Sequence, residues 1–132
     1  MTATADIVSV LVPLAIEGTY SYRVPAGLAL APGDIVEVPV GPRSYVACVW
    51  DDPAEPIATS RLKSVAAKFD CPPLSENMRR FVDWVANWTL APKGMVLRMV
   101  LRAPAALEPP APQVGVRATG EAPERLTDAR RR

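Results

Sequence analysis

The stretch that decides the expected fold is Thr19–Gly41, TYSYRVPAGLALAPGDIVEVPVG. At its start, Tyr20, Tyr22 and Val24 alternate with smaller or polar residues, which places the three on one face of a strand. The Pro-Ala-Gly and Pro-Gly-Asp triplets that follow each predict a turn. Ile35–Val40 then predicts a second strand, so the stretch reads as two strands joined by turns.

Similar segments lie on both sides of this stretch. Gly41-Pro42-Arg43 ends the second strand with a turn, and we expect the strands around it to form an antiparallel meander. A polar loop is expected at Asp51–Ser60. Five short strands with short connections predict a small twisted barrel or a curled antiparallel sheet. The expected strands are Ile7–Val12, Thr19–Val24, Ile35–Val40, Tyr45–Trp50 and Leu62–Val65.

A helix is expected after Pro72-Pro73, with Ser75 as its N-cap and Pro92 at its end. Apolar residues recur at helical spacing and predict one inward face, made of Met78, Phe81, Val82, Val85 and Trp88. We interpret Trp84 and Trp88 as packing residues, with base stacking as the alternative. The expected solvated side consists of Arg79, Arg80, Asp83 and Asn87.

A second, shorter helix is expected after Gly94 and before Pro104. Its expected inward residues are Met95, Val96, Met99 and Val100, with Arg98 and Arg102 together on another side. Strands followed by two short helices predict an α+β fold.

The composition changes at the C-terminal end. Ala103–Pro112 is rich in proline and alanine and predicts an extended linker. Val114–Ala118 predicts a short strand, and Pro123-Glu124-Arg125 resembles the start of a helix. We therefore divide the chain into a domain at 1–104 and, at 105–132, a linker with the start of a further domain.

The composition excludes several classes of protein. The chain has 132 residues, a net charge of +1 and no histidine, which argues against a coat for long duplex DNA, a His/Cys zinc site and histidine catalysis. Cys48 and Cys71 are expected to be reduced. There is no signal peptide pattern and no apolar run long enough to span a membrane, so we expect a cytoplasmic protein.

No pattern in the sequence predicts catalysis. The phosphate-binding motif GxxxxGK[ST] does not occur in these residues, so they carry no ATPase loop of that type. No carboxylate pair is singled out as acid and base. We expect neither a catalytic residue, a metal nor a cofactor.

The order and spacing of several segments resemble a known family. The chain is similar to the N-terminal 3′-DNA-binding domain of primosomal protein N′, the bacterial replication-restart helicase. The matching segments are Ile7–Pro13, Thr19–Tyr22, Val24-Pro25, Pro32–Val36, Val38–Gly41, Arg61–Val65 and Met78–Leu101. In that family a winged-helix domain and helicase lobes follow. The resemblance implies a non-catalytic domain that binds the 3′ end of a nascent DNA strand at a stalled fork.

The resemblance also implies which residues bind the terminal nucleotide. Tyr20, Ser21 and Tyr22 correspond to an aromatic-acidic-aromatic triplet that lines the nucleotide pocket, with Ser21 in place of the common aspartate. Aromatic rings stack on any base, so such a pocket recognises an end and not a sequence. A serine hydroxyl also accepts a hydrogen bond from a 3′-hydroxyl, although more weakly than a carboxylate.

Four further residues complete the expected site. Gly41 corresponds to a pocket glycine, although a turn requirement explains it equally well. Lys63 is the expected phosphate contact, assisted by Arg61 and Arg43. The expected partners are DNA with a free 3′ end, forked or single-stranded, and also other primosome proteins and single-stranded-DNA-binding protein. The residues leave open an SH3-like module that binds a peptide, an RNA-binding barrel and, last, a hydrolase.

Overall fold

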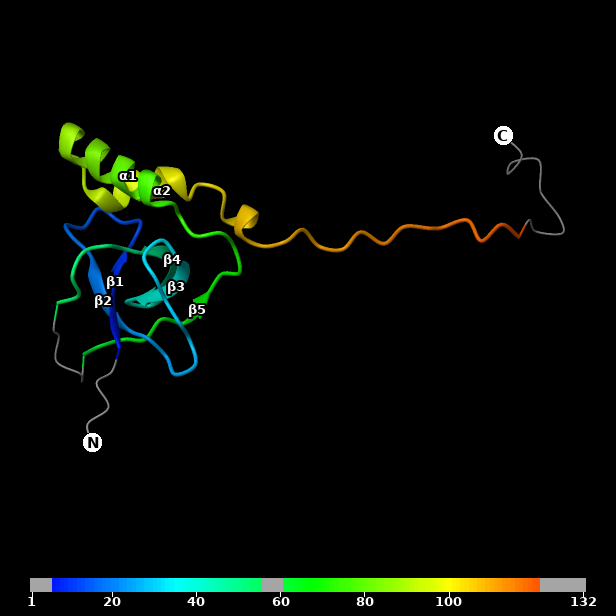
Figure 1. Ribbon diagram of the computed structural model, residues 1–132, viewed down its shortest axis with the longest axis horizontal. Helices are drawn as coiled ribbons and strands as arrows, with labels where there is room; N and C mark the ends of the chain where they lie inside the picture. Colours follow the sequence, from blue (N-terminus) through cyan, green and yellow to red (C-terminus); the bar gives the residue numbers. More distant parts are fainter. Residues whose placement is uncertain (1–5, 56–60, 122–132) are drawn as a thin grey trace.

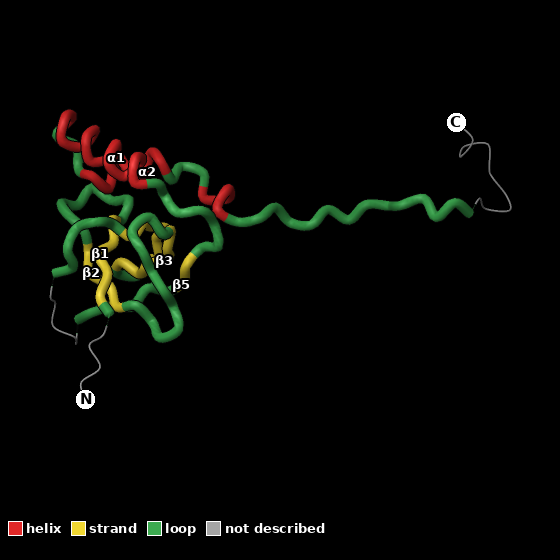
Figure 2. Tube along the Cα trace, viewed as in Figure 1, coloured by secondary structure: helices red, strands yellow, loops and turns green. Residues whose placement is uncertain are grey.

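The structure is a computed structural model that describes residues 6–55 and 61–121. Its strands are β1 (Ile7–Leu11), β2 (Tyr20–Arg23), β3 (Ile35–Val40), β4 (Arg43–Val49) and β5 (Ala67–Lys68). They are followed by the helices α1 (Glu76–Thr89) and α2 (Lys93–Val100) and by a 3-10 turn, η1 (Pro104–Leu107). The α+β fold is confirmed, with the two helices on one side of the sheet and the C-terminal segment extending away from it (Figures 1 and 2).

The sheet is antiparallel throughout, with the strand order β2-β1-β4-β3-β5. The expected meander is therefore wrong for β2, which pairs with β1 and not with β3. Alternation predicts where strands lie but says nothing of which strands pair. Only the β3–β4 hairpin keeps the expected neighbours, in a register from Ile35 opposite Cys48 to Val40 opposite Arg43.

The two outer edges of the sheet approach each other at residues 63–68. Ser64 forms an isolated parallel bridge with Arg23 at the β2 edge, and β5 pairs with Val36 and Glu37 at the β3 edge. The prediction of a strand at Leu62–Val65 is wrong, because this segment contributes only that one bridge. The sheet is curled, and a single short segment connects its edges.

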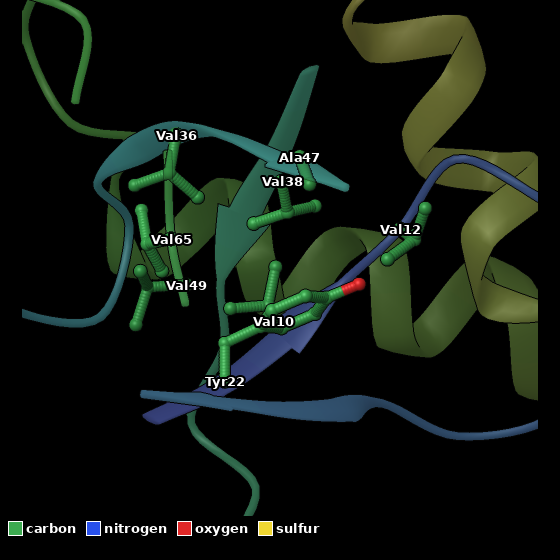
Figure 3. Close-up of a cluster of buried hydrophobic side chains, with 8 residues drawn as sticks. All are labelled: Val10, Val12, Tyr22, Val36, Val38, Ala47, Val49 and Val65. Carbon is green, nitrogen blue, oxygen red and sulfur yellow. The ribbon is translucent and has the colours of Figure 1, made fainter. Parts of the chain in front are cut away.

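Both faces of the central strands are buried, so the molecule has two apolar clusters. One fills the concave side of the sheet and consists of Val10, Val12, Tyr22, Val36, Val38, Ala47, Val49 and Val65 (Figure 3). The other lies between the sheet and the helices and consists of Leu11, Ile35, Cys48, Trp50, Val82, Ala86, Val96 and Leu97. Burial raises the pKa of the Cys48 thiol to about 12, so this cysteine remains an uncharged packing residue.

The first helix begins where it was expected. Ser75 is its N-cap, and the Ser75 hydroxyl accepts a hydrogen bond from the Met78 amide at 3.2 Å. The helix ends at Thr89, followed by Leu90 in the left-handed conformation with a φ of 56°. The second helix begins directly after Pro92, so Gly94 lies inside it. A Cβ on Gly94 would lie 2.3 Å from the carbonyl oxygens of Val12 and Leu14, so a glycine is needed where α2 approaches the sheet.

The expected inward faces of both helices are wrong in part. On α1 the buried residues are Arg79, Val82 and Ala86, whereas Trp84 and Trp88 are 58% and 78% exposed. The helix carries two apolar stripes, and the sheet covers the stripe with small side chains, which allows closer approach. On α2 the buried residues are Gly94, Val96 and Leu97, and Met99 and Val100 are exposed.

The segment after α2 also differs from expectation at two places. The predicted linker begins with η1, whose Leu107 packs against the helix-side cluster. The predicted strand at Val114–Ala118 is wrong, because this segment has no strand partner and both of its valines are fully exposed. The predicted helix start at Pro123 and the terminal arginines lie outside the described residues.

Candidate nucleic-acid interface

The hydroxyl of Tyr22 connects β2 with the end of β3. The Tyr22 ring lies in the concave cluster, only 4% exposed, and its hydroxyl donates a hydrogen bond of 2.9 Å to the carbonyl oxygen of Pro39 (Figure 3). Burial, and then the proximity of Tyr20, raise the pKa of Tyr22 to about 12, so the donor stays protonated at neutral pH. This bond holds the β3–β4 turn, which begins at Gly41, beside β2.

A small open hollow forms where this turn, β2 and the segment at 61–63 meet. It encloses about 200 Å³ and is lined by Tyr20, Ser21, Tyr22, Val40, Gly41, Arg61 and Lys63. Pockets for drug-sized ligands enclose roughly 300–1,000 Å³, so this hollow is small enough to enclose a nucleotide only in part. Residues from three separate parts of the chain, six of them expected from the sequence, are thereby brought together.

The hydroxyl of Ser21 has a defined hydrogen-bond direction. It donates a hydrogen bond of 3.0 Å to the carbonyl oxygen of Glu55, which lies 34 residues away in the sequence. A carbonyl oxygen only accepts, so the single proton of the Ser21 hydroxyl is committed to it. The lone pairs of that hydroxyl remain available, so Ser21 can accept a hydrogen bond from a ligand.

The glycine of the hollow is required by the turn. Val40 and Arg43 pair directly, so Gly41 and Pro42 form a two-residue hairpin loop. Gly41 has a φ of +58°, and the proline that follows is fixed near −65°, which excludes a type I′ turn and favours type II′, with glycine in its first position. No atom of the protein lies within 4 Å of where its Cβ would be, so the space beside it is open to a ligand.

The two cations of the hollow are held by the backbone on either side of them. The Arg23 amide donates to the Lys63 carbonyl oxygen at 2.9 Å, and the side chains of Leu62 and Val65 are buried. Lys63 and Arg61 themselves are exposed, and neither has an ion pair within residues 6–55 and 61–121. The segment is not the predicted strand, yet its alternation presents Lys63 outward as expected.

Arg43 does not line this hollow. It stands at the start of β4 and lines a neighbouring hollow of about 390 Å³, together with Leu14, Tyr45 and Arg98. The hairpin loop therefore separates Arg43 from the other expected site residues. Tyr20, at 38% exposure, is the ring of the hollow that is most open to solvent.

The comparisons with known proteins are consistent with this geometry. The family model described as 3′DNA-binding domain (3′BD), from PriA, matches residues 9–102, which include β2 to β5, most of β1, both helices and the residues of the hollow. The chain belongs to this family. It is a DNA-binding domain of the primosomal helicase type, and the domain itself is non-catalytic. A search of curated proteins finds no match to the chain.

Sequence reasoning missed two groups that shape the 3′BD hollow. The carbonyl oxygens of Pro39 and Glu55 orient Tyr22 and Ser21, and no pattern of side chains predicts a backbone acceptor.

The described part of the chain contains no group of three or more metal-ligating side chains. Within that part, none of the helices has the length and apolar character needed to cross a bilayer.

Proposed function

We propose that this 3′BD captures the free 3′ end of a nascent DNA strand at a stalled replication fork, as a step in primosome assembly and replication restart in the cytoplasm. The terminal nucleotide enters the hollow beside β2. Its base stacks on Tyr20, its sugar lies beside Gly41, and Lys63, assisted by Arg61, binds the adjacent phosphate. Contacts with other primosome proteins and with single-stranded-DNA-binding protein belong to the same proposal.

The observation that carries the proposal is the orientation of the Ser21 hydroxyl. Because its proton is directed to the Glu55 carbonyl oxygen, this hydroxyl acts as an acceptor toward the hollow. A 3′-hydroxyl can donate to it. A 3′-phosphate is a dianion for most of its population at pH 7, with acceptor oxygens and added bulk, so it cannot make this contact.

The test compares single-stranded oligonucleotides that end in 3′-hydroxyl or in 3′-phosphate, by fluorescence anisotropy. We expect tighter binding of the hydroxyl end. Ser21→Ala, which removes the acceptor, should bring the affinity ratio of the two ends close to one, whereas Ser21→Asp should raise it because a charged acceptor binds the hydroxyl more strongly and repels a phosphate. Ser44→Ala is the matched control, since Ser44 does not line this hollow.

Equal affinities of the unmodified protein for the two ends would contradict end recognition. That result would favour generic nucleic-acid binding, including RNA, or the peptide-binding module. The ratio is the informative quantity, because Ser21→Asp also adds a negative charge that repels the DNA backbone of both oligonucleotides alike.

A further inference from the structure

A series of three aromatic rings runs along the solvent side of α1. Phe81, Trp84 and Trp88 are 54%, 58% and 78% exposed. Their ring centroids are 6.1 and 6.0 Å apart, and their planes differ by only 18° and 9°. We call these three residues the aromatic ladder. Burial in the domain does not account for them, since the sheet packs against the opposite side of the helix.

A hollow lies between α1 and α2, and it is lined by Val85 and Thr89 of α1, each next in sequence to a tryptophan of the aromatic ladder. It encloses about 580 Å³ and is lined mainly by apolar side chains: Val85, Thr89, Ala91, Met95, Val96, Arg98, Met99, Leu101 and Arg102. Its lining contains two arginines and no carboxylate. Both arginines are exposed, and neither has an ion pair or a hydrogen bond of its side chain within the described chain.

A second hollow extends from this groove to the start of β4, beside the hairpin loop of the proposed nucleotide hollow. Arg98 lines the helix groove and also lines the hollow that contains Arg43. Arg43 in turn lies two residues after Gly41, which lines the nucleotide hollow. No carboxylate lines any of these three hollows. The three hollows therefore offer a route without carboxylates, with arginines in the first two and the Gly41-Pro42 loop between the second and the nucleotide hollow.

We propose that, where the captured 3′ end belongs to single-stranded DNA, the strand leading to it follows this route, past Arg43 to Arg98 and Arg102, and that its bases stack on the aromatic ladder. The inference rests on the proposed function, because that function places the strand's end at the start of the route. Exposed aromatic rings are stacking platforms for any base, and arginines neutralise phosphates, which together are the two components of sequence-independent single-strand binding.

The same surface is less well matched to a protein partner. A protein partner would need to contact only the groove and the aromatic ladder, and Arg43 lies outside both. A strand with one negative charge per nucleotide accounts for all three arginines and for the lack of carboxylates along the route. An acidic apolar peptide seated in the groove would use Arg98 and Arg102 and leave Arg43 without a role.

Tryptophan fluorescence tests the route in the unmodified protein. Trp50 is 2% exposed, so quenching by DNA reports on Trp84 and Trp88. We expect quenching by a poly-dT oligonucleotide with a 3′-hydroxyl and, at higher concentration, by circular single-stranded DNA, which has no end. We expect none from a hairpin duplex of equal charge. Affinity should also rise with oligonucleotide length beyond the terminal nucleotide.

Variants separate the aromatic ladder from the cations. Trp84→Ala combined with Trp88→Ala should weaken binding of a long oligonucleotide by about tenfold or more and abolish the gain with length. Replacing Arg43, Arg98 and Arg102 by glutamine should reduce the slope of log K against log salt by about 2. Arg117→Gln and Val116→Ala are the controls, because both residues are exposed on the extended C-terminal segment.

Failure of the route and failure of end recognition give different results. Unchanged affinity for long oligonucleotides in the tryptophan variant, with no quenching by any DNA, overturns the route even if the hydroxyl end is preferred. Binding of an acidic peptide in competition with DNA at the groove, with no effect of Arg43→Gln on DNA affinity, overturns it as well. Equal affinity for the hydroxyl and phosphate ends overturns the proposed function, and the length dependence then reports on the route alone.

Discussion

The two faces of α1 differ in a way that is unusual for a helix packed on a sheet: the buried face contains a charged residue, and the exposed face contains large apolar ones. The face toward the sheet contains Arg79, which is only 8% exposed, beside Val82 and Ala86. The face toward solvent contains the aromatic ladder. A charged group is thus inside and three large apolar rings are outside, on one helix of 14 residues.

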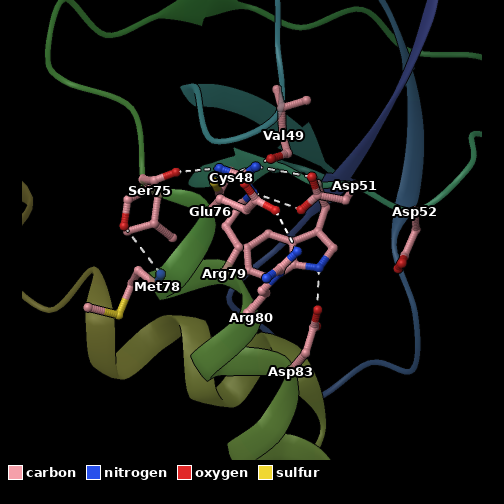
Figure 4. Close-up of polar contacts among 12 residues, drawn as sticks. Cys48, Val49, Asp51, Asp52, Ser75, Glu76, Met78, Arg79, Arg80 and Asp83 are labelled. Atoms are coloured by element: carbon pink, nitrogen blue, oxygen red, sulfur yellow. Dashed lines mark hydrogen bonds and ion pairs between the residues drawn. The ribbon is translucent and has the colours of Figure 1, made fainter.

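The inward charge is stable because each of the three nitrogen atoms of the Arg79 guanidinium donates a hydrogen bond. The Arg79 guanidinium donates from Nε and Nη2 to the two carboxylate oxygens of Asp51, at 2.7 and 3.1 Å, and from Nη1 to the Leu74 carbonyl oxygen at 2.6 Å (Figure 4). A bidentate pair of this kind fixes geometry as well as charge. It joins α1 to the end of β4 and to the segment before the helix. The inner face therefore holds the fold, and the outer face is available for a ligand.

Among these predictions, the largest change in stability should come from removing the buried charge of α1. Arg79→Ala should lower the free energy of unfolding by about 3 kcal/mol. This is the lower end of the range for breaking a buried ion pair, because the Asp51 side chain is 48% exposed. Arg80→Ala is the matched control, because the Arg80–Glu76 pair is exposed and contributes roughly 0.5 kcal/mol. Urea unfolding of both variants measures the difference. Equal losses would show that Arg79 is not a structural residue.

The second prediction compares the loss of stability when an apolar residue is removed from the buried face or from the exposed face of α1. Val82 is completely buried, so Val82→Ala should cost roughly 2 kcal/mol through lost burial and the cavity it leaves. Trp84→Ala removes a much larger side chain from an exposed position and should change stability by no more than about 0.5 kcal/mol. Thermal melts decide the comparison. A strong destabilisation by Trp84→Ala would show that the ladder packs within the domain.

Acid should weaken the inner face in a way that depends on Asp51. The hydrogen bond from Arg79 is the main cause that lowers the pKa of Asp51 below its usual value. A carboxyl group with a lowered folded-state pKa contributes stability that is present above its unfolded pKa, near 3.9, and is lost as the pH falls through the folded value.

Asp51→Asn measures that contribution. At pH 7 the variant should be less stable by about 1 kcal/mol, and the deficit should shrink as the pH is lowered from about 4 toward 2. Denaturant unfolding at a series of pH values checks this expectation. A deficit that stays constant over this range would mean that the Asp51 charge does not support Arg79.

The smallest effect on stability is expected for a substitution outside α1, at a residue that faces the proposed ligand. Lys63→Ala should leave the unfolding free energy within about 0.5 kcal/mol, while the salt slope of single-strand binding falls by about 0.7, the value for one phosphate contact. Lys68→Ala is the control, since Lys68 lies in β5, 3.5 Å from Asp34 and away from the hollow. An unchanged slope in Lys63→Ala would remove Lys63 from the phosphate contact.

Local patterns in the sequence predicted the elements, but not which surfaces meet. Alternation located β2, β3 and β4, and the Ser75 N-cap was identified from its neighbours alone. Periodicity failed on α1 because two stripes of that helix are apolar, and the choice between them depends on the shape of the sheet. Arg79 was placed in solvent because its partner Asp51 lies 28 residues away. The division of the chain at residue 104 stays a prediction.

The sequence also named residues that the structure places around one hollow, for a reason tied to the resemblance, and their role as a binding site stays a prediction. Tyr20, Ser21, Gly41 and Lys63 come from segments whose order and spacing match the family, and the structure brings them together. Arg43 was included from its position beside Gly41 in the sequence, and the hairpin carries it to the other side of the loop. Nearness in sequence is a poor guide across a tight turn, where successive residues point in different directions.

The connection of both sheet edges by residues 63–68 bears on how the domain would fail. Unpaired edge strands are templates on which other chains assemble into aggregates, and β2 and β3 are the strands at risk. Because one short segment covers both strands, its detachment exposes two unpaired strand edges at once. Mild heat or shear that releases this segment should therefore cause copies of the domain to aggregate before the helices unfold.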